Sequence, residues 1–236
     1  MKIEMKNLTK KYDNKVVLNN INLKIKDAKV VGIIGTSGCG KSTLLRQLAA
    51  LEDFDSGEIE VNGLKLSLAN KVKYRENIGY VFQEHSLFPH LNVEDNIKLI
   101  LEKIKKKDKS ESKKITDSLL EEFSLTKEAK KLPSKISGGQ AQRASIVRAI
   151  ATTPKLLFLD EPTSALDPVL TNEVLESIKT LKNKGMEFIF VTHEMKFLKD
   201  IADYYIFMNQ GKIIDHGKIN EINESKSNML KKFINI

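Results

Sequence analysis

The sequence lacks the features that mark several common classes of protein. Only one of its 236 residues is cysteine, Cys39, which excludes an internal disulfide framework and a cysteine-based zinc site and fits a reducing compartment. No uninterrupted apolar run approaches the ~20 residues that span a bilayer, so the chain makes no membrane path by itself. The first residues, MKIEMKNLTKKYDN, contain no apolar segment of the kind that a secretory signal needs. We therefore expect a cytoplasmic location.

Arginine is scarce although the chain is basic. Lys and Arg number 39 against 31 Asp and Glu, which gives a net charge of +8. Arginine, whose guanidinium group can bind phosphate with two hydrogen bonds, occurs only at Arg46, Arg75, Arg143 and Arg148. Residues 103–114 alone hold seven lysines. We interpret this run as a solvated loop between two helices that faces an anionic membrane surface. A nucleic-acid partner is therefore not expected.

The order of elements predicts an α/β fold of one domain with a helical insertion. Short apolar runs such as VVGIIG (30–35), KLLFLD (155–160) and EFIFVT (187–192) are typical of buried parallel strands. Helices are expected from Lys41 to Leu51 and from Pro168 to Lys184, the second capped by Asp167, and a helical block spans about residues 92–153. Strands that alternate with helices imply a parallel sheet covered by helices.

Residues 35–42, GTSGCGKS, fit the phosphate-loop pattern G-x-x-x-x-G-K-[ST] between an apolar strand and a leucine-rich helix. Glycine lets such a loop curl so that successive N–H groups face a phosphate at the helix N-terminus. Lys41 is expected to reach the β- and γ-phosphates, and the Ser42 hydroxyl to bind Mg²⁺. The competing interpretation is a glycine-rich turn that only connects the strand to the helix.

An acidic pair follows the apolar strand in LLFLDEP (156–162). Asp160 is expected to hold Mg²⁺ through water, and Glu161 to polarise a water molecule for attack on the γ-phosphate. By itself this pair could be a plain strand end. Together with the phosphate loop, it predicts hydrolysis of a nucleoside triphosphate.

A second glycine-rich segment at the start of a helix, ISGGQAQR (136–143), helps to decide which family of nucleoside triphosphatases the chain resembles. Alone it could be an ordinary serine-capped helix, although a helix N-terminus also attracts anions. Taken in order with GTSGCGKS, Gln83, LLFLDEP, SALD (164–167) and VTHE (191–194), it resembles the nucleotide-binding subunit of ATP-binding-cassette (ABC) transporters over essentially the whole chain. The departures, at Thr36, Cys39, Ile136 and Ala141, remove no catalytic group.

The resemblance implies a P-loop NTPase core with a mainly parallel sheet, an N-terminal antiparallel β subdomain and an inserted α-helical subdomain. One ABC ATPase domain would cover residues 1–236, with the β subdomain and first part of the core in 1–86, the helical subdomain in 87–153 and the rest of the core in 154–236. The implied ligands are ATP and Mg²⁺.

The resemblance also implies a role for each motif. Glu161 matches the catalytic base, His193 the switch histidine at the γ-phosphate, and Gln83 the glutamine that touches Mg²⁺ and the attacking water; Lys41 joins them as a catalytic residue. Mg²⁺ ligands would be Ser42, Gln83 and Asp160. Tyr12 matches the aromatic residue that stacks on adenine, although it could be a surface tyrosine. ATP would contact Tyr12, Gly35, Thr36, Ser37, Gly38, Cys39, Gly40, Lys41, Ser42 and Thr43, and in the opposite subunit Ser137, Gly138, Gly139, Gln140 and Asp167.

The implied partners are a second copy of the chain in a head-to-tail dimer, transmembrane permease subunits and, indirectly, an extracytoplasmic solute-binding protein. Residues 84–91 resemble the groove that receives a permease helix, but Leu87, Phe88 and Leu91 could equally be core. Segments such as FQEHSLFPHLNVEDNI (82–97) look most like the subunits that energise polar amino-acid uptake, peripheral to the cytoplasmic face of the membrane. The alternatives are an exporter, a lipoprotein-release or a division-linked ATPase, a non-transport cassette acting on ribosomes or DNA, and a degenerate regulator.

Overall fold

The computed structural model describes residues 1–13, 15–164 and 166–234. The chain forms two compact units, which we describe separately: unit 1 contains Met1–Arg75 and Gly185–Ile236, and unit 2 contains Glu76–Lys184. The division of the sequence at residues 86 and 153 stays a prediction.

Unit 1 contains an antiparallel sheet of strands β1 (Ile3–Tyr12), β2 (Lys15–Ile25), β4 (Ser56–Val61) and β5 (Leu64–Lys65), in the order β2-β1-β4-β5. Alternation places one side of these strands in the core, where Ile3, Met5 and Leu8 are almost fully buried. Asn62 and Gly63, with φ of 50° and 80°, join β4 to β5, because a two-residue hairpin turn needs residues that accept positive φ.

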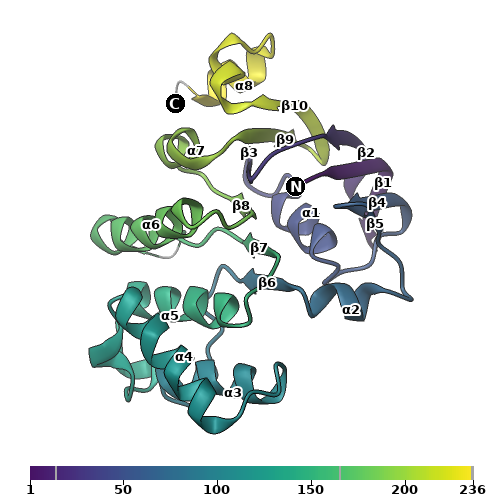
Figure 1. The fold of residues 1–236 in the computed structure, drawn as a ribbon. Helices are drawn as coiled ribbons and strands as arrows, with labels where there is room; N and C mark the ends of the chain where they lie inside the picture. The colour runs from purple at the N-terminus through teal and green to yellow at the C-terminus, as the bar shows by residue number, and fades with distance from the viewer. Residues whose placement is uncertain (14, 165, 235–236) are drawn as a thin grey trace. The chain divides into compact units, whose positions relative to one another are not determined.

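Unit 1 also contains strands β3 (Val30–Gly35), β8 (Phe188–Val191), β9 (Tyr204–Asn209) and β10 (Lys212–Lys218), in the order β10-β9-β3-β8; β3 and β8 carry the expected buried runs, whereas no residue of β10 is buried. Strand β3 is parallel to both β8 and β9, and every residue of β3 and β8 is buried. Helix α1 (Lys41–Leu48) packs against β2, β3 and β8 (Figure 1). The smaller helices are α2 (Lys71–Arg75), α7 (Met195–Ile201), η3 (Ile219–Glu224) and α8 (Asn228–Ile234).

The helix predicted from Lys41 to Leu51 ends three residues earlier, at Leu48. Ala50 has a φ of 53°, in the left-handed region that a continuing helix does not enter, and its carbonyl accepts a hydrogen bond from Arg75 Nε at 2.7 Å. Leu51 therefore continues the helical spacing of apolar residues in the sequence, although the helix itself ends before it.

Unit 2 contains the parallel strands β6 (Ile78–Val81) and β7 (Leu156–Leu159) and four main helices, α3 (Val93–Lys103), α4 (Lys109–Glu122), α5 (Gly138–Ala151) and α6 (Pro168–Asn183). Helices α3, α4 and α5 contact one another, and α5 also packs on α6 and β6 (Figure 1). Two short turns, η1 (Thr126–Glu128) and η2 (Pro133–Lys135), lead into α5. The fold is thus α/β, with the antiparallel strands, mainly parallel strands and helical block that were expected.

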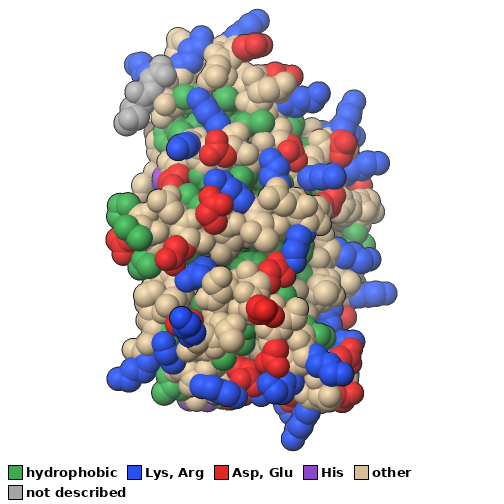
Figure 2. Space-filling model, turned by 60° about the vertical axis from the view of Figure 1, so that its left-hand side comes forward, with side chains coloured by type: hydrophobic (Ala, Val, Ile, Leu, Met, Phe, Trp, Pro, Cys, Tyr) green, Lys and Arg blue, Asp and Glu red, His purple; other side chains and the backbone are tan. Residues whose placement is uncertain are grey.

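The lysine-rich run at 103–114 is more helical than predicted. Lys103 ends α3, and Asp108 caps α4, which begins at Lys109, so that only residues 104–108 lie outside the helices. The loop interpretation was wrong for the second half because the Asp108 carboxylate accepts a hydrogen bond from Glu111 N at 2.8 Å and starts the helix there. On the face in Figure 2, Lys and Arg side chains are interspersed with Asp and Glu.

None of the helices in the described parts of the chain has the length and apolar character that crossing a bilayer requires.

Candidate functional site

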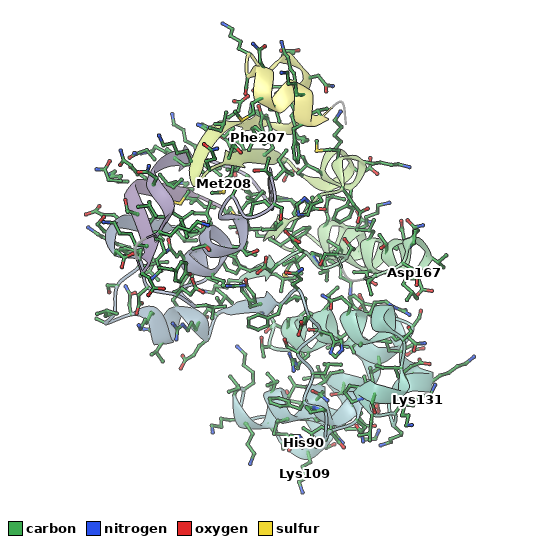
Figure 3. The ribbon with its side chains drawn as sticks, turned by 180° about the vertical axis from the view of Figure 1, so that it is seen from behind. His90, Lys109, Lys131, Asp167, Phe207 and Met208 are labelled. Carbon is green, nitrogen blue, oxygen red and sulfur yellow. The ribbon has the colours of Figure 1, made fainter. Side chains whose placement is uncertain are left out.

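The predicted phosphate loop connects β3 to α1 in unit 1. Gly40 stands at the N-terminus of α1 with a φ of 103°, a left-handed conformation that favours glycine. A Cβ on Gly35 would lie 2.2 Å from the carbonyl oxygen of Met208 on β9, so a larger residue there would displace the strand (Figure 3). The first N–H groups of α1 have no partner within the helix and suit an anion.

Lys41 is buried by the loop that surrounds it. Its ammonium donates hydrogen bonds to the carbonyl oxygens of Gly35 at 3.2 Å and Thr36 at 3.1 Å. Thr36 is tied in turn to β9, because its hydroxyl donates to Asn209 Oδ1 at 2.9 Å. The loop therefore holds the Lys41 ammonium against its own backbone carbonyls, and this positive charge suits the binding of a phosphate chain.

Cys39 lies inside the loop and is 4% exposed. Burial raises the pKa of the Cys39 thiol, and the neighbouring Lys41 ammonium offsets only part of the rise. The backbone carbonyl of Cys39 accepts a hydrogen bond from Gly211 N at 3.0 Å. Cys39 therefore fills space and fixes the loop to the turn between β9 and β10.

Tyr12, expected to stack on adenine, ends β1 and has 41% of its surface exposed. Its hydroxyl donates to the Glu52 carboxylate, which Arg46 Nη1 also contacts at 3.3 Å. Burial raises the pKa of the Tyr12 hydroxyl and the hydrogen bond to Glu52 adds to the rise, while a hydrogen bond with Thr43 opposes it. The ammonium of Lys10 lies 5.1 Å from the ring centroid. The ring is thus anchored at its hydroxyl end beside the predicted loop residue Thr43.

His193 follows β8 at the same edge as the loop. Ile33 and Val191 are paired in the parallel register of β3 and β8, and Thr192 N donates to the Ile33 carbonyl at 3.2 Å. Two residues beyond this pair are Gly35 and His193, so the register brings the switch-histidine candidate level with the start of the loop. The side chain of His193 is exposed.

In unit 2, Asp160 directly follows the fully buried strand β7 and is 1% exposed. Its Oδ2 accepts a hydrogen bond from the hydroxyl of Tyr80 at 3.0 Å, and its backbone N donates to the Val81 carbonyl at 2.9 Å. The ring of Tyr80 is 6.3 Å from that of Phe158 and 4.6 Å from that of Phe82. Tyr80 therefore orients the carboxylate, a role that the sequence did not indicate.

Glu161 has an unusual backbone conformation. Its φ of 44° is left-handed, which costs a non-glycine residue on the order of 1 kcal/mol. Its carbonyl accepts hydrogen bonds from the backbone N of Ser164 at 3.2 Å and from the Ser164 hydroxyl at 3.1 Å. This turn holds Glu161 at the end of β7, where the predicted base is required.

Gln83 follows β6 in the same way that Glu161 follows β7. Val81 and Leu159 are paired in the parallel register, so the residues two positions further on, Gln83 and Glu161, come level with each other. The Phe82 carbonyl between strand and glutamine accepts a hydrogen bond from Gln142 Nε2 at 3.2 Å. Helix α5 thereby fixes the backbone that carries the exposed Gln83.

The signature segment starts α5 with a reciprocal cap. Gln140 N donates to the Ser137 hydroxyl at 3.2 Å, and Ser137 N donates to Gln140 Oε1 at 2.9 Å. Gln140 Nε2 also donates to Glu128 at 3.3 Å. A Cβ on Gly139 would lie 3.0 Å from Cβ of Leu170 on α6, so this start of the helix packs closely on its neighbour.

Asp167, expected at a dimer interface, is an exposed residue at the start of α6 (Figure 3). Its carboxylate caps the helix, accepting from Val169 N at 2.9 Å and Leu170 N at 3.0 Å. The helix and its cap follow the sequence prediction. In the SALD motif, Ala165 lies outside the described residues.

The segment at 84–91 divides between core and surface. Leu87 is buried, whereas Phe88 is 38% exposed, with the guanidinium of Arg148 lying 5.6 Å from its ring centroid. The fully buried Asn96 shapes the turn, because it accepts from Phe88 N at 2.8 Å and donates to the Leu91 carbonyl at 3.0 Å. Leu87 therefore belongs to the core, and Phe88 stays a candidate contact for a permease.

The residues proposed for Mg²⁺ offer a hydroxyl, an amide and a carboxylate oxygen, at Ser42, Gln83 and Asp160. Oxygen donors of this kind fit Mg²⁺, which prefers a few protein oxygens and keeps several waters. Among the described residues there is no cluster of three or more His, Cys, Asp or Glu side chains that could hold a metal ion.

Comparison with known proteins identifies the family. The sequence profile of the ABC transporter family matches residues 18–164. The chain belongs to the ABC transporter family. The glutamate/aspartate import ATP-binding protein GltL of Escherichia coli (strain K12) is 40% identical over 98% of both chains. The glutamate transport ATP-binding protein GluA of Corynebacterium efficiens is 43% identical over 90% of this chain and 89% of its own. The arginine transport ATP-binding protein ArtM of Bacillus subtilis (strain 168) is 42% identical over 93% and 92%.

Solved structures of ABC cassettes confirm the fold of this ABC-family chain. The ATP-binding cassette MJ0796, in a dimeric post-hydrolysis state bound to ADP and Pi, superposes with a TM-score of 0.82 at 31% identity, covering 92% of this chain and 98% of that one. A second dimeric structure of MJ0796, a bacterial ABC transporter cassette, gives a TM-score of 0.81 at 32% identity, with the same coverage. The expected α/β cassette architecture is therefore confirmed.

Proposed function

We propose that this chain is the ATP-hydrolysing subunit of an ABC importer that takes up a polar amino acid through separate transmembrane subunits. The main support for ATPase activity is the strand–loop–helix of residues 30–48, in which a glycine-rich loop at a helix N-terminus surrounds the buried Lys41. The relatives are named for transport of glutamate, aspartate and arginine and are about as long as this chain, which supports an amino-acid cargo.

In unit 1, ATP would bind with its phosphates on residues 35–43 and its adenine on Tyr12. Lys41 would exchange its two carbonyl contacts for the β- and γ-phosphates. Tyr12 would offer a ring face at low entropic cost, because Glu52 already holds its hydroxyl. His193, level with Gly35 at the strand edge, would contact the γ-phosphate.

In unit 2, Glu161 would accept a proton from the water that attacks the γ-phosphate, and Gln83 would orient that water. The hydrogen bonds that Ser164 donates to the Glu161 carbonyl and the one that Gln142 donates to the Phe82 carbonyl hold these two positions before substrate arrives. Mg²⁺, held by Ser42, Gln83 and Asp160, would supply charge neutralisation on the phosphates.

Two copies would close head to tail over two ATP molecules. The α5 N-terminus, with Ser137, Gly138, Gly139 and Gln140, would then stabilise the γ-phosphate bound by the other copy, with Asp167 at the interface. We further propose that residues 87–153 form the helical subdomain of the cassette, that Phe88 contacts the permease, and that the chain works at the cytoplasmic face of the membrane beneath an extracytoplasmic solute-binding protein.

Gene deletion followed by complementation tests the proposal. In a strain lacking this gene, uptake of labelled glutamate, glutamine or arginine is expected to fall and to return with the wild-type gene. Lys41→Ala is expected to fail because it weakens nucleotide binding, whereas Lys212→Ala, which removes an exposed lysine of the same unit, is expected to restore uptake. Unchanged uptake of all polar amino acids, with a defect in export, lipoprotein release or division, would support one of the alternatives instead.

A further inference from the structure

A buried carboxylate from the turn before α5 contacts the signature segment of unit 2. Glu128 is the last residue of η1 and is 7% exposed. Its Oε1 accepts a hydrogen bond from Gln140 Nε2 at 3.3 Å and also contacts Lys131 Nζ at 3.3 Å (Lys131 is labelled in Figure 3). A buried carboxylate needs such partners, so Glu128 is anchored at the point where it meets Gln140.

The contact with Glu128 decides which way the Gln140 amide points. Gln140 Oε1 accepts a hydrogen bond from the backbone N of Ser137 at 2.9 Å. A reversed amide would turn its NH₂ toward the Ser137 N–H and its oxygen toward the Glu128 carboxylate. Both contacts would be repulsive, because an N–H only donates and a carboxylate only accepts. Glu128 therefore keeps the amide in the orientation that closes the reciprocal cap of α5.

The cap in turn orients the hydroxyl of Ser137. This hydroxyl accepts the backbone N–H of Gln140 at 3.2 Å, so its own hydrogen is left to donate to another acceptor. In the proposed dimer that acceptor is the γ-phosphate bound by the other copy. Glu128 is thus connected to the signature serine through the side chain of Gln140, which bonds to both residues.

We propose that Glu128 is a positioning residue for the signature segment, which it presents to the nucleotide of the opposite copy by fixing the Gln140 amide. The inference rests on the proposed function, because it assumes that Ser137 acts on ATP bound by a second copy. Glu128 is not expected to contact the nucleotide itself, since Gln140 and Lys131 engage its Oε1.

Amide hydrogen exchange at Ser137, followed by NMR, tests the positioning without nucleotide. The Ser137 N–H is expected to be protected in the wild type, because Gln140 Oε1 accepts it. Glu128→Lys places a donor opposite the amide and is expected to reverse it, so that exchange at Ser137 accelerates at least about tenfold. Glu128→Gln keeps an acceptor and is expected to keep the protection. Unchanged protection in folded Glu128→Lys overturns the proposal.

Two further variants complete this experiment. Glu121→Lys makes the same exchange at an exposed position of α4 and is expected to leave the protection of Ser137 unchanged. Glu128→Met is similar in length to the wild-type side chain and removes the acceptor without adding a charge. If Glu128→Lys does not fold, a loss of Ser137 protection in Glu128→Met supports the proposal, and wild-type protection overturns it.

ATP-dependent dimerisation tests the functional consequence. In a Glu161→Gln background, which removes the proposed base, light scattering at increasing protein concentration measures the dimer affinity. Glu128→Lys is expected to weaken the dimer about tenfold or more, whereas Glu128→Gln is expected to match the wild type. Affinity of the monomer for ATP, measured with a fluorescent nucleotide, is expected to stay the same. Equal weakening by Glu128→Gln overturns the proposal, because charge and not amide orientation would then matter.

Failure of this inference differs from failure of the proposed function. If mixed dimers containing Ser137→Arg have activity proportional to the wild-type fraction, catalysis in trans is contradicted, and the role of Glu128 is overturned with it even where Ser137 loses its protection. If catalysis in trans holds but Glu128→Lys dimerises normally and keeps Ser137 protected, only the role of Glu128 is overturned.

Discussion

Single residues at the site combine chemistry with local constraints on the backbone. Glu161 is held in a left-handed conformation by a turn to Ser164, and Asp160 is aligned by the hydroxyl of Tyr80. Neither constraint is needed to end a strand. The left-handed φ of Glu161 is shared with other non-glycine residues such as Ala50 and Ser124, so it orients the predicted base but does not by itself mark a functional residue.

Glu161→Gln should separate ATP binding from hydrolysis. The amide keeps the size of the side chain but cannot accept a proton, so turnover is expected to fall by roughly 10²–10⁴-fold while ATP affinity is retained. Phosphate release and nucleotide binding measure the two effects. Glu176→Gln, on the exposed surface of α6, is the matched control and should change neither. Unchanged turnover in Glu161→Gln would remove this residue from the role of base.

Cys39 should react slowly with alkylating agents. Because burial raises the pKa of the thiol, less thiolate is present at a given pH than in an exposed cysteine, and the rate is expected to keep rising with pH above the ordinary thiol range. Mass spectrometry after iodoacetamide treatment measures it without interference, since Cys39 is the only cysteine. Cys39→Ser with Ser134→Cys, an exposed position, gives the fast reference. Equal rates would contradict burial of the thiol.

At the scale of elements, helix α3 is anchored by a buried carboxylate. Glu94 is 3% exposed and contacts Lys98 at 2.8 Å and Lys130 at 2.6 Å. Burial alone would raise the pKa of Glu94, but the hydrogen bonds from Lys130 and Lys98 outweigh it and lower the pKa to about 2. The carboxylate therefore stabilises the fold above the ordinary pKa of 4.5, and this contribution disappears as the pH falls toward 2.

Glu94→Gln should accordingly lower the free energy of unfolding by about 2 kcal/mol at pH 7. The difference from wild type is expected to shrink between pH 4.5 and 2, because the wild-type carboxylate then loses its charge as well. Urea unfolding at several pH values measures it. Asp117→Asn breaks an exposed pair on α4 and should cost about 0.5 kcal/mol or less. A loss for Glu94→Gln that did not vary with pH would contradict the ion-pair origin.

The N-terminus of α5 allows structure and function to be separated. Ser137→Ala and Asp108→Ala each remove the capping side chain of a helix in unit 2, so each should destabilise the fold by about 1 kcal/mol. Only Ser137→Ala is expected to reduce ATPase activity, because only this hydroxyl belongs to the proposed signature contact. Similar losses of activity in the two variants would mean that capping, and not nucleotide contact, explains the effect of Ser137.

The sequence predicted the elements better than their limits. The caps at Asp167 and Ser137 and the strands of VVGIIG and LLFLD are local signals, and the structure contains them. The end of α1 depends on a left-handed Ala50 whose carbonyl is held by Arg75, a contact distant in sequence. Strand pairing that sets His193 level with Gly35 likewise depends on tertiary register, which residue spacing does not encode.

At the scale of the whole molecule, each of the two units carries part of the predicted set of site residues. Tyr12, Lys41 and His193 belong to unit 1, and Gln83, Glu161 and the signature segment to unit 2. Motif order in the sequence predicted these positions, but the groups that support them, such as Tyr80, Gln142, Asn96 and Asn209, were missed. No sequence signal marked these residues, because each acts through hydrogen bonds that form only in the fold.

Mixed dimers should reveal a site completed by a second copy. If Ser137 acts on ATP bound by the partner, Ser137→Arg mixed with wild type should reduce activity more steeply than dilution alone, because each variant chain also inactivates its neighbour. ATPase activity as a function of the wild-type fraction measures this, with Ser134→Arg, an exposed nearby position, as the control. Activity proportional to the wild-type fraction would contradict catalysis in trans.

At Glu161, whose backbone is left-handed, selection for stability and selection for activity are expected to favour different residues. Glycine or asparagine fits a φ of 44° better than glutamate does, so a screen rewarding heat resistance alone should enrich those replacements. The same screen would discard the carboxylate that we propose as the catalytic base. Selection for heat resistance is therefore expected to lower ATP turnover when it changes position 161.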